Sequence, residues 1–177
     1  MSHEVLNRIR ARLTEAGVSY REIEHAPTRT SEESARARGE PLSVGAKALL
    51  LRVEDTFRLF VLPAHCKLDS AAVKRHFGAK SLRFATSEEL LALTGLVPGS
   101  VPPFGEPILR FELFADGTVG AEHGRVAFNA GSLTHSIVMA TADWEAVAQA
   151  KKFAFAIADS RLDELRAGSV TGTVSGG

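Results

Sequence analysis

Residues 45–62 read GAKALLLRVEDTFRLFVL. Two apolar runs, 48–53 and 57–62, are separated by the polar residues Glu54, Asp55 and Thr56. Apolar runs of this length on either side of a short polar turn are typical of two antiparallel strands. The stretch therefore predicts a buried hairpin.

Helix signals occur on both sides of this hairpin. The first predicted helix carries its apolar residues on one face and ends at Gly17. Those residues are Val5, Leu6, Ile9 and Leu13. Thr and Asp side chains cap helices by accepting hydrogen bonds from free backbone amides, and Gly commonly follows the last turn. These signals predict further helices near Thr30, Asp69, Thr86 and Asp143.

Short strands are also predicted, at residues 18–24, 81–84, 108–114, 125–129, 135–141 and 153–157. Many of them are linked too tightly for the crossovers that parallel strands need. We therefore expect an α/β (α+β) fold with a mixed, mostly antiparallel, strongly curved or barrel-like sheet flanked by helices. The domain is expected to span residues 1–160, with a flexible tail at 161–177.

The composition is that of one globular domain, with 177 residues of which 45% are hydrophobic. Its 21 basic and 21 acidic residues balance, so no overall field draws the chain to DNA or to an anionic membrane. The first residues are too polar for a signal peptide, and no apolar run approaches the ~20 residues of a membrane span. Cys66 has no second cysteine to pair with. We expect a cytoplasmic protein.

The usual patterns of nucleophilic and metal-dependent catalysis are missing from the sequence. No Gly-x-Ser-x-Gly elbow occurs, and the adjacent His65 and Cys66 have no further ligands at metal-binding spacing. We expect no metal and no other cofactor. His65 lies too close in sequence to serve as a base for Cys66, so we interpret Cys66 as a small buried apolar residue.

Lys47 stands at the start of the first apolar run. An unpaired ammonium group is costly in a buried strand, so this lysine needs a partner. Two interpretations remain open. Either its stem reaches solvent or its charge pairs with an internal acid, or the ammonium group binds an anionic ligand.

The proline-rich loop at residues 99–105, GSVPPFG, is the second candidate for a functional element. Its prolines lack an amide hydrogen, whereas the amides of Gly99, Ser100 and Val101 can donate. Rigid turns of this kind are commonly structural. Amides held in a fixed direction can also stabilise a developing oxyanion, which makes the loop a candidate catalytic element.

Together with residues 129–135, NAGSLTH, these features resemble the YbaK and prolyl-tRNA synthetase editing-domain family. Members of that family remove wrong amino acids from tRNA. The resemblance extends from Val5 to Ala158. The matching motifs are His25-Ala26-Pro27, Thr30-Ser31-Glu32-Glu33, Ala46-Lys47-Ala48-Leu49, Val61-Leu62-Pro63, Leu82-Arg83-Phe84-Ala85, Thr94-Gly95 and Pro103-Phe104-Gly105.

The resemblance implies roles for individual residues. Lys47 matches the family's lysine, which would bind the phosphate of the terminal adenosine or the substrate carbonyl. Gly99 and Pro103 match a Gly-x-x-x-Pro loop that holds the ester and the ribose. The implied catalytic residues are Lys47, Gly99, Ser100, Val101 and Pro103. The implied substrate-binding residues are His25, Thr30, Phe104, Gly105, Gly131, Ser132 and His135. For His135, a hydrogen-bonded histidine at the start of a strand is the alternative.

An aminoacyl ester is labile, so a positioned water and fixed amides suffice for its hydrolysis. We therefore expect a trans-editing hydrolase of mischarged aminoacyl-tRNA that carries a small amino acid such as Ala, Ser, Thr or Cys, with tRNA-Pro as one candidate. The 3′ terminal adenosine would be recognised by this chain alone or with a synthetase or elongation factor as partner. A non-catalytic tRNA- or nucleotide-binding module and a hydrolase of small esters are the alternatives.

Overall fold

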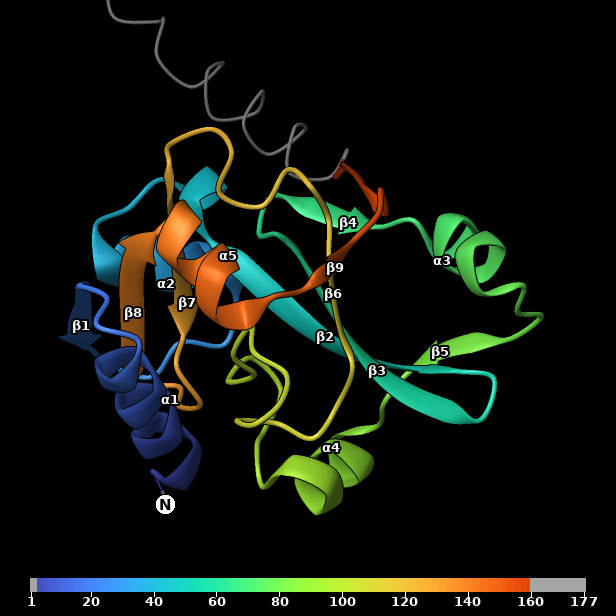
Figure 1. Cartoon of the computed structure of the whole chain (residues 1–177), viewed down its shortest axis with the longest axis horizontal. Helices are drawn as coiled ribbons and strands as arrows, with labels where there is room; N and C mark the ends of the chain where they lie inside the picture. The colour runs from blue at the N-terminus through green and yellow to red at the C-terminus, as the bar shows by residue number, and fades with distance from the viewer. Residues whose placement is uncertain (1–2, 160–177) are drawn as a thin grey trace, which may run out of the picture.

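The computed structural model describes residues 3–159, and the tail predicted at 161–177 lies outside the described residues. Figure 1 shows α1 and α2 beside the strands β1, β8 and β7, with α3 and β5 at the opposite end of the molecule. The helices are α1 (Glu4–Glu15), α2 (Ser31–Arg38), the 3-10 helix η1 (Leu42–Val44), α3 (Ser70–Phe77), α4 (Ser87–Thr94) and α5 (Thr141–Ala148). The strands are β1 (Tyr20–Glu24), β2 (Ala46–Val53), β3 (Thr56–Pro63), β4 (Cys66–Leu68), β5 (Leu82–Phe84), β6 (Leu113–Ala115), β7 (Arg125–Asn129), β8 (His135–Ala140), β9 (Lys151–Lys152) and β10 (Ala156–Ala158).

The predicted helix starts are confirmed for α2, α3 and α4. Thr30 and Thr86 each accept a hydrogen bond from the amide of a glutamate three residues later, and each glutamate accepts one from the threonine amide in return. Asp69 caps α3 by accepting from the Ala72 amide at 3.1 Å. α5 begins at Thr141, two residues before the predicted start at Asp143.

The predicted hairpin is confirmed, whereas the single strongly curved or barrel-like sheet is wrong. β2 pairs with β3 over its whole length, so that Lys47 lies opposite Leu62. The strands form separate sheets with the orders β5-β2-β3-β6-β9, β1-β8-β7 and β10-β4. Among the described residues the first two sheets are joined by a single bridge between Gly45 and Ala127, so the ladder does not continue around a barrel.

The sheets are mixed and mostly antiparallel, as predicted. β6 is parallel to both of its neighbours, β3 and β9, and the other strand pairs are antiparallel. Two of the predicted strands include residues that are not in a strand in the structure. In the predicted strand 108–114, the amides of Ile108 and Leu109 both donate to the Gly105 carbonyl in a turn, and only Leu113 and Phe114 belong to β6. In the predicted strand 153–157, only Ala156 and Ile157 belong to β10.

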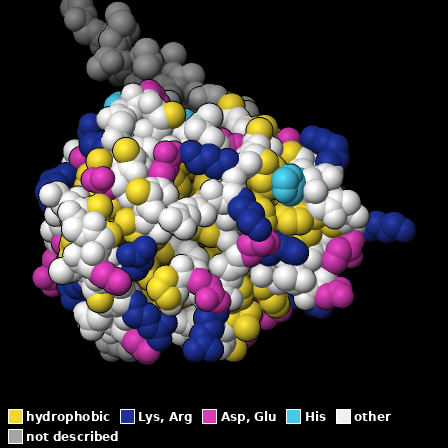
Figure 2. Space-filling view, in the orientation of Figure 1, with side chains coloured by type: hydrophobic (Ala, Val, Ile, Leu, Met, Phe, Trp, Pro, Cys, Tyr) yellow, Lys and Arg dark blue, Asp and Glu magenta, His cyan; other side chains and the backbone are white. Residues whose placement is uncertain are grey.

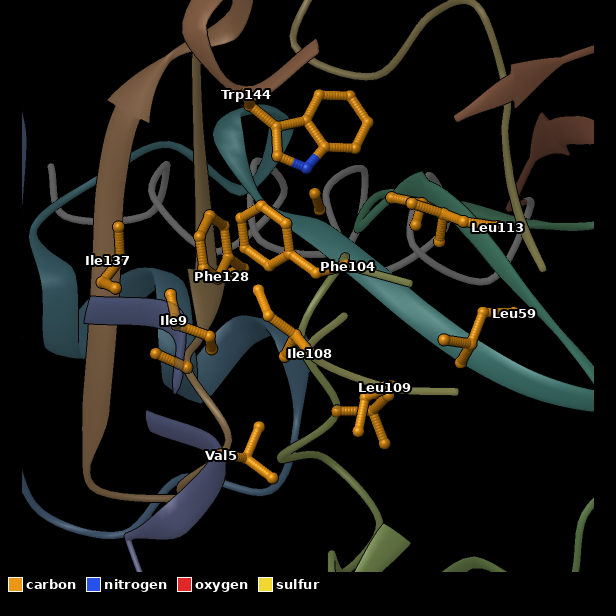
Figure 3. Close-up of a cluster of buried hydrophobic side chains, with 14 of the residues drawn as sticks. Val5, Ile9, Leu59, Phe104, Ile108, Leu109, Leu113, Phe128, Ile137 and Trp144 are labelled. Carbon is orange, nitrogen blue, oxygen red and sulfur yellow. The ribbon is translucent and has the colours of Figure 1, made fainter. Parts of the chain in front are cut away.

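The core is divided by the five-stranded sheet because side chains alternate between the faces of a strand. Leu59 and Val61 of β3 pack in the larger cluster, whereas Phe60 and Leu62 pack in the smaller cluster against Val73 of α3. Figure 3 shows the larger cluster, where side chains from α1, the proline-rich loop, β7 and α5 meet. The hairpin is therefore covered on both faces, as its apolar sequence predicted.

Asp116 ties the last described strand to the rest of the molecule. Its side chain is only 4% exposed, and one carboxylate oxygen accepts hydrogen bonds of 2.8 Å from the amides of Phe155 and Ala156. The other oxygen accepts from the Thr118 amide at 2.9 Å. β10, which begins at Ala156, in turn pairs with β4.

The surface carries both signs of charge. Figure 2 shows Lys and Arg side chains mixed with Asp and Glu side chains over the face that it draws. This mixture agrees with the balanced composition of the chain. Among the described residues, no helix is long and apolar enough to cross a membrane.

Candidate functional site

A depression of about 190 Å³ opens where α2, the start of β2 and the proline-rich loop meet. Its size suits a small group rather than a large aromatic ligand. Four of the residues implied by the resemblance line it, namely Thr30, Lys47, Gly99 and Val101. Arg29, Ser34, Arg38 and Asn129 line it as well.

Lys47 is half-buried at the wall of the depression. Its ammonium group donates a hydrogen bond to the backbone carbonyl of Cys66 in β4. An ammonium group has three hydrogens, and a carbonyl is a neutral acceptor. The lysine is thus held in place at the depression by the strand beside it.

The proline-rich loop is fastened at three places. The Asn129 side-chain amide donates to the Gly99 carbonyl at 2.8 Å. The Ser100 hydroxyl donates to the Val97 carbonyl at 2.8 Å and accepts from the Val97 amide at 3.2 Å. Further along, the Trp144 indole donates to the Pro103 carbonyl at 3.0 Å. These bonds fix the loop against β7 and α5.

The three amides proposed as donors differ in this structure. The Ser100 amide already donates to the Val97 carbonyl at 3.1 Å, so it does not face a ligand. Within residues 3–159, the amides of Gly99 and Val101 have no hydrogen-bond acceptor. Both residues line the depression. The candidate oxyanion site therefore narrows to two amides.

A buried polar network, which the sequence did not reveal, lies behind the depression. Arg38 is 9% exposed and donates from Nε to the Ser136 hydroxyl at 2.9 Å. Its Nη2 donates to Asn129 Oδ1 at 3.0 Å. Burial lowers the pKa of Arg38 to about 10, an effect that the charge of Glu40 opposes, so the group is still charged at neutral pH.

The periodicity of α2 indicates which helix face Arg38 shares, but not its distant partners. Ser34 and Arg38 are four residues apart and therefore share a helix face. Ser34 and Arg38 are buried together with Ala35. His25, one of the predicted binding residues, joins the same network because its Nε2 lies 2.7 Å from the Ser136 hydroxyl oxygen.

Three implied residues of the proline-rich loop lie in or beside the hydrophobic core rather than at the depression. Phe104 is 2% exposed and packs edge-on against Phe128, with ring centroids 5.4 Å apart. Figure 3 shows both rings below Trp144. At Gly105 a Cβ atom would lie 2.7 Å from the Phe111 carbonyl oxygen. The Pro103 carbonyl accepts from Trp144, as described above.

The other implied residues lie beside the N-terminal end of α1. A Cβ at Gly131 would lie 2.8 Å from a methyl carbon of Val5. Ser132 and Thr134 exchange a hydrogen bond of 2.9 Å, and the Thr134 hydroxyl lies 2.9 Å from His135 Nδ1. The His135 ring packs edge-on against His3. None of Gly131, Ser132 and His135 lines the depression.

Two further observations concern metal-ligating side chains and the thiol of Cys66. The described part of the chain contains no group of three or more metal-ligating side chains. Burial, together with the nearby charge of Asp116, raises the pKa of the Cys66 thiol. Cys66 is therefore a neutral thiol at pH 7, which disfavours it as a nucleophile.

Comparisons with known proteins identify a family and individual relatives of this chain. Residues 25–147 match the family described as the aminoacyl-tRNA editing domain. The chain is 33% identical over 147 residues to the multifunctional Ser/Thr-tRNA deacylase ProXp-y of Escherichia coli (strain K12), covering 80% of this chain and 87% of that protein. Over 77 residues it is 38% identical to the proline–tRNA ligase of Shouchella clausii, covering 44% of this chain and 14% of the ligase.

The fold is also shared with a solved structure. A crystal structure described as a candidate trans-editing enzyme for prolyl tRNA synthetase matches with a TM-score of 0.72 and 26% sequence identity. The match covers 88% of this chain and 98% of that one. The sequence match, the near full-length relative and the shared fold agree, and this chain belongs to the aminoacyl-tRNA editing domain family.

Proposed function

We propose that the protein is a trans-editing deacylase that hydrolyses the ester bond of mischarged aminoacyl-tRNA. One observation carries the proposal: Lys47 and the loop residues Gly99 and Val101, which are more than 50 residues away from it in the chain, line the same depression. The membership in the editing-domain family supports the same chemistry. The reaction belongs in the cytoplasm, where aminoacyl-tRNA is made and used.

The proposed reaction uses water as the nucleophile. The water oxygen attacks the ester carbonyl, and the amides of Gly99 and Val101 stabilise the oxyanion that develops on the carbonyl oxygen. The ester C–O bond then breaks, and the ribose oxygen takes up the proton that the attacking water gives up, which leaves a ribose hydroxyl and the free amino acid. Lys47 binds either the anionic phosphate of the 3′ terminal adenosine or the substrate carbonyl.

A small hydroxyl-bearing amino acid, serine or threonine, is the substrate group that we propose. The relative from Escherichia coli bears the name of a Ser/Thr-tRNA deacylase. The depression is small and contains the hydroxyl side chains of Thr30, Ser31 and Ser34. A polar pocket that hydrogen-bonds a hydroxyl discriminates strongly against analogues that lack it.

The test is deacylation of tRNA charged with Ala, Ser, Thr, Cys or Pro, measured in single turnover with wild type and Lys47→Ala. We expect the wild type to release Ser or Thr fastest and Lys47→Ala to be slower by about 10- to 1000-fold, with an unchanged melting temperature. Arg36→Ala is a matched control because Arg36 is an exposed cation on α2.

The same experiment separates the alternatives. Binding of charged tRNA without release of any amino acid would favour a non-catalytic module. Rapid hydrolysis of small esters that intact tRNA does not inhibit would favour a small-ester hydrolase. Addition of a synthetase or an elongation factor shows whether the chain needs a partner to receive its tRNA.

A further inference from the structure

Arg38 is a buried charge without a carboxylate partner in the described part of the chain. Glu40, two residues later, pairs with Arg21 and Arg125 instead. A buried cation is expensive unless its hydrogens are accepted, and here neutral groups accept them. The question is what this arginine provides that an apolar residue in α2 would not.

The hydrogen bonds around Asn129 supply the answer. A guanidinium group can only donate, whereas an asparagine amide has one accepting and one donating end. Arg38 Nη2 and the Ser136 hydroxyl both donate to Asn129 Oδ1, at 3.0 and 3.1 Å. The donating end of Asn129 is thereby turned the other way, where Nδ2 donates to the Gly99 carbonyl at 2.8 Å.

The Gly99 carbonyl belongs to the peptide unit that joins Gly99 to Ser100. Holding this carbonyl fixes the plane of that peptide, whose own amide is that of Ser100. Because each neighbouring peptide is joined to it through a single α-carbon, the amides of the two neighbouring peptides are restricted as well. Those are the amides of Gly99 and Val101, two residues that line the depression. Gly99 has a φ of +90°, which glycine adopts without steric cost. Without the hydrogen bond from Asn129, the backbone at Gly99 could therefore move easily.

We infer that Arg38 is a positioning residue, which orients Asn129 so that its amide holds the Gly99 carbonyl and aims the loop amides at the substrate. The inference rests on the proposed deacylase function for its kinetic consequence. The chain of hydrogen bonds from Arg38 through Asn129 to Gly99 does not depend on that function and can be tested without it.

The kinetic test compares Arg38→Lys with Asn129→Asp. Lysine keeps the charge but lacks the planar fork that bonds Ser136 and Asn129 together. Aspartate keeps the shape and the accepting end of Asn129 but places an acceptor against the Gly99 carbonyl. We expect each variant to lower kcat about 10-fold or more while KM changes less than about 3-fold, as for an interaction made in the transition state.

The double variant sharpens this test. If both residues act through one bond to Gly99, the double variant should lose little more than either single variant. Arg36→Lys serves as the matched control on the exposed side of α2. A wild-type deacylation rate in Arg38→Lys would show that only the charge of Arg38 matters for catalysis. A change confined to KM would show that Arg38 contributes to substrate binding. Either result overturns the inference.

A spectroscopic measurement keeps the inference testable without any activity. The chain contains two asparagines, Asn7 and Asn129, and one glutamine, Gln149, so the side-chain amide signals in a ¹⁵N spectrum are few. In the wild type we expect the Asn129 NH₂ hydrogens to exchange slowly with solvent compared with those of the exposed Asn7. In Arg38→Lys they should exchange faster, and the Gly99 and Val101 amide signals should shift.

These outcomes are distinct from those of the function test. A wild type that hydrolyses no charged tRNA defeats the proposed function but leaves the exchange measurement valid. Fast exchange of the wild-type Asn129 amide, or unshifted Gly99 and Val101 signals in Arg38→Lys, overturns the positioning role. If Arg38→Lys does not fold, the wild-type exchange rate and Asn129→Asp still decide.

Discussion

The loops at Gly99 and Gly131 begin with the same two residues but lie in different surroundings. Each glycine is followed by a serine and has a left-handed backbone, with φ of +90° at Gly99 and +72° at Gly131. A Cβ at Gly131 would lie 2.8 Å from the Val5 side chain and 3.2 Å from the Leu6 amide nitrogen. At Gly99 the nearest atom would be the Arg29 carbonyl oxygen at 3.2 Å.

The difference shows why glycine alone does not mark a site. Gly131 lets the chain pass close to α1, so it is needed for packing. Gly99 lies at the depression, where its amide has no acceptor within residues 3–159 and its carbonyl is held by Asn129. Contacts with distant residues, and not the shared Gly-Ser pair, show the different roles of the two loops. Substitutions in each loop should therefore damage different properties.

The largest effect is expected for Gly99→Pro. Proline removes the amide hydrogen and cannot adopt φ of +90°, so the loop loses one of its two proposed oxyanion donors. We expect the single-turnover deacylation rate to fall about 100- to 1000-fold while affinity for tRNA changes little. The measurement is hydrolysis at saturating enzyme, with binding and thermal melting recorded separately. A normal rate would show that the loop is only a structural turn.

Gly131→Ala should reduce stability rather than chemistry. The substitution adds left-handed strain and a clash with Val5, together about 2–4 kcal/mol of unfolding free energy. Gly124→Ala is a matched control because Gly124 has a φ of +68° but no atom within 4 Å of a Cβ. Its cost should be about 1 kcal/mol, the strain alone. Urea unfolding measures both, and equal costs would contradict the packing role of Gly131.

His135→Gln tests whether the second loop contributes to the substrate pocket. His135 lies against His3 and the Thr134 hydroxyl and not at the depression. We expect the rates for seryl- and threonyl-tRNA to change less than about 3-fold, the range of a distant substitution. A selective loss of one amino acid substrate would instead bring this loop into the pocket, as the family resemblance implies.

The smallest effect is expected for Cys66→Ser. Burial raises the pKa of the thiol, and the proposed chemistry uses water instead of a thiolate. The rate should stay within about 2-fold of wild type because Lys47 donates to the backbone carbonyl of Cys66, which the substitution keeps. Mass spectrometry after mixing with charged tRNA provides the check. An acyl group trapped on Cys66 would require a different mechanism.

Local features of the fold could be predicted because their causes lie a few residues apart. The caps at Thr30 and Thr86 involve glutamates three residues later, and the β2–β3 turn joins adjacent apolar runs. The strand predicted at 108–114 failed because Ile108 and Leu109 place their side chains in the core from a turn. Apolar character reports burial and not the backbone conformation that achieves it.

The site could be predicted only in part, for the same reason. Lys47 stood out because a charged residue is unusual at the start of a buried apolar run. Gly99 stood out because it begins a loop that contains two prolines and a second glycine. Arg38 did not, since its partners Ser136 and Asn129 are 98 and 91 residues away. The use of the Ser100 amide within its own turn was equally hidden, because the sequence does not specify the direction of each amide.

The Asp116 carboxylate links proton binding to the support of Lys47. Burial opposes ionisation of this carboxyl, but hydrogen bonds from Thr118, Phe155 and Ala156 outweigh that effect and lower its pKa. A carboxyl with a depressed pKa adds stability above its unfolded pKa, and that stability disappears as the pH falls through the folded pKa.

At neutral pH the hydrogen bonds to Asp116 are therefore intact. As the pH falls below about 4, the usual pKa of aspartate, this contribution to stability declines. The folded carboxyl itself becomes protonated, and the attachment of β10 weakens, only when the pH reaches its lowered pKa. β10 is the partner of β4, and the Cys66 carbonyl of β4 accepts the hydrogen bond from Lys47. Acid thus weakens the support of Lys47 through a carboxyl group on the loop after β6.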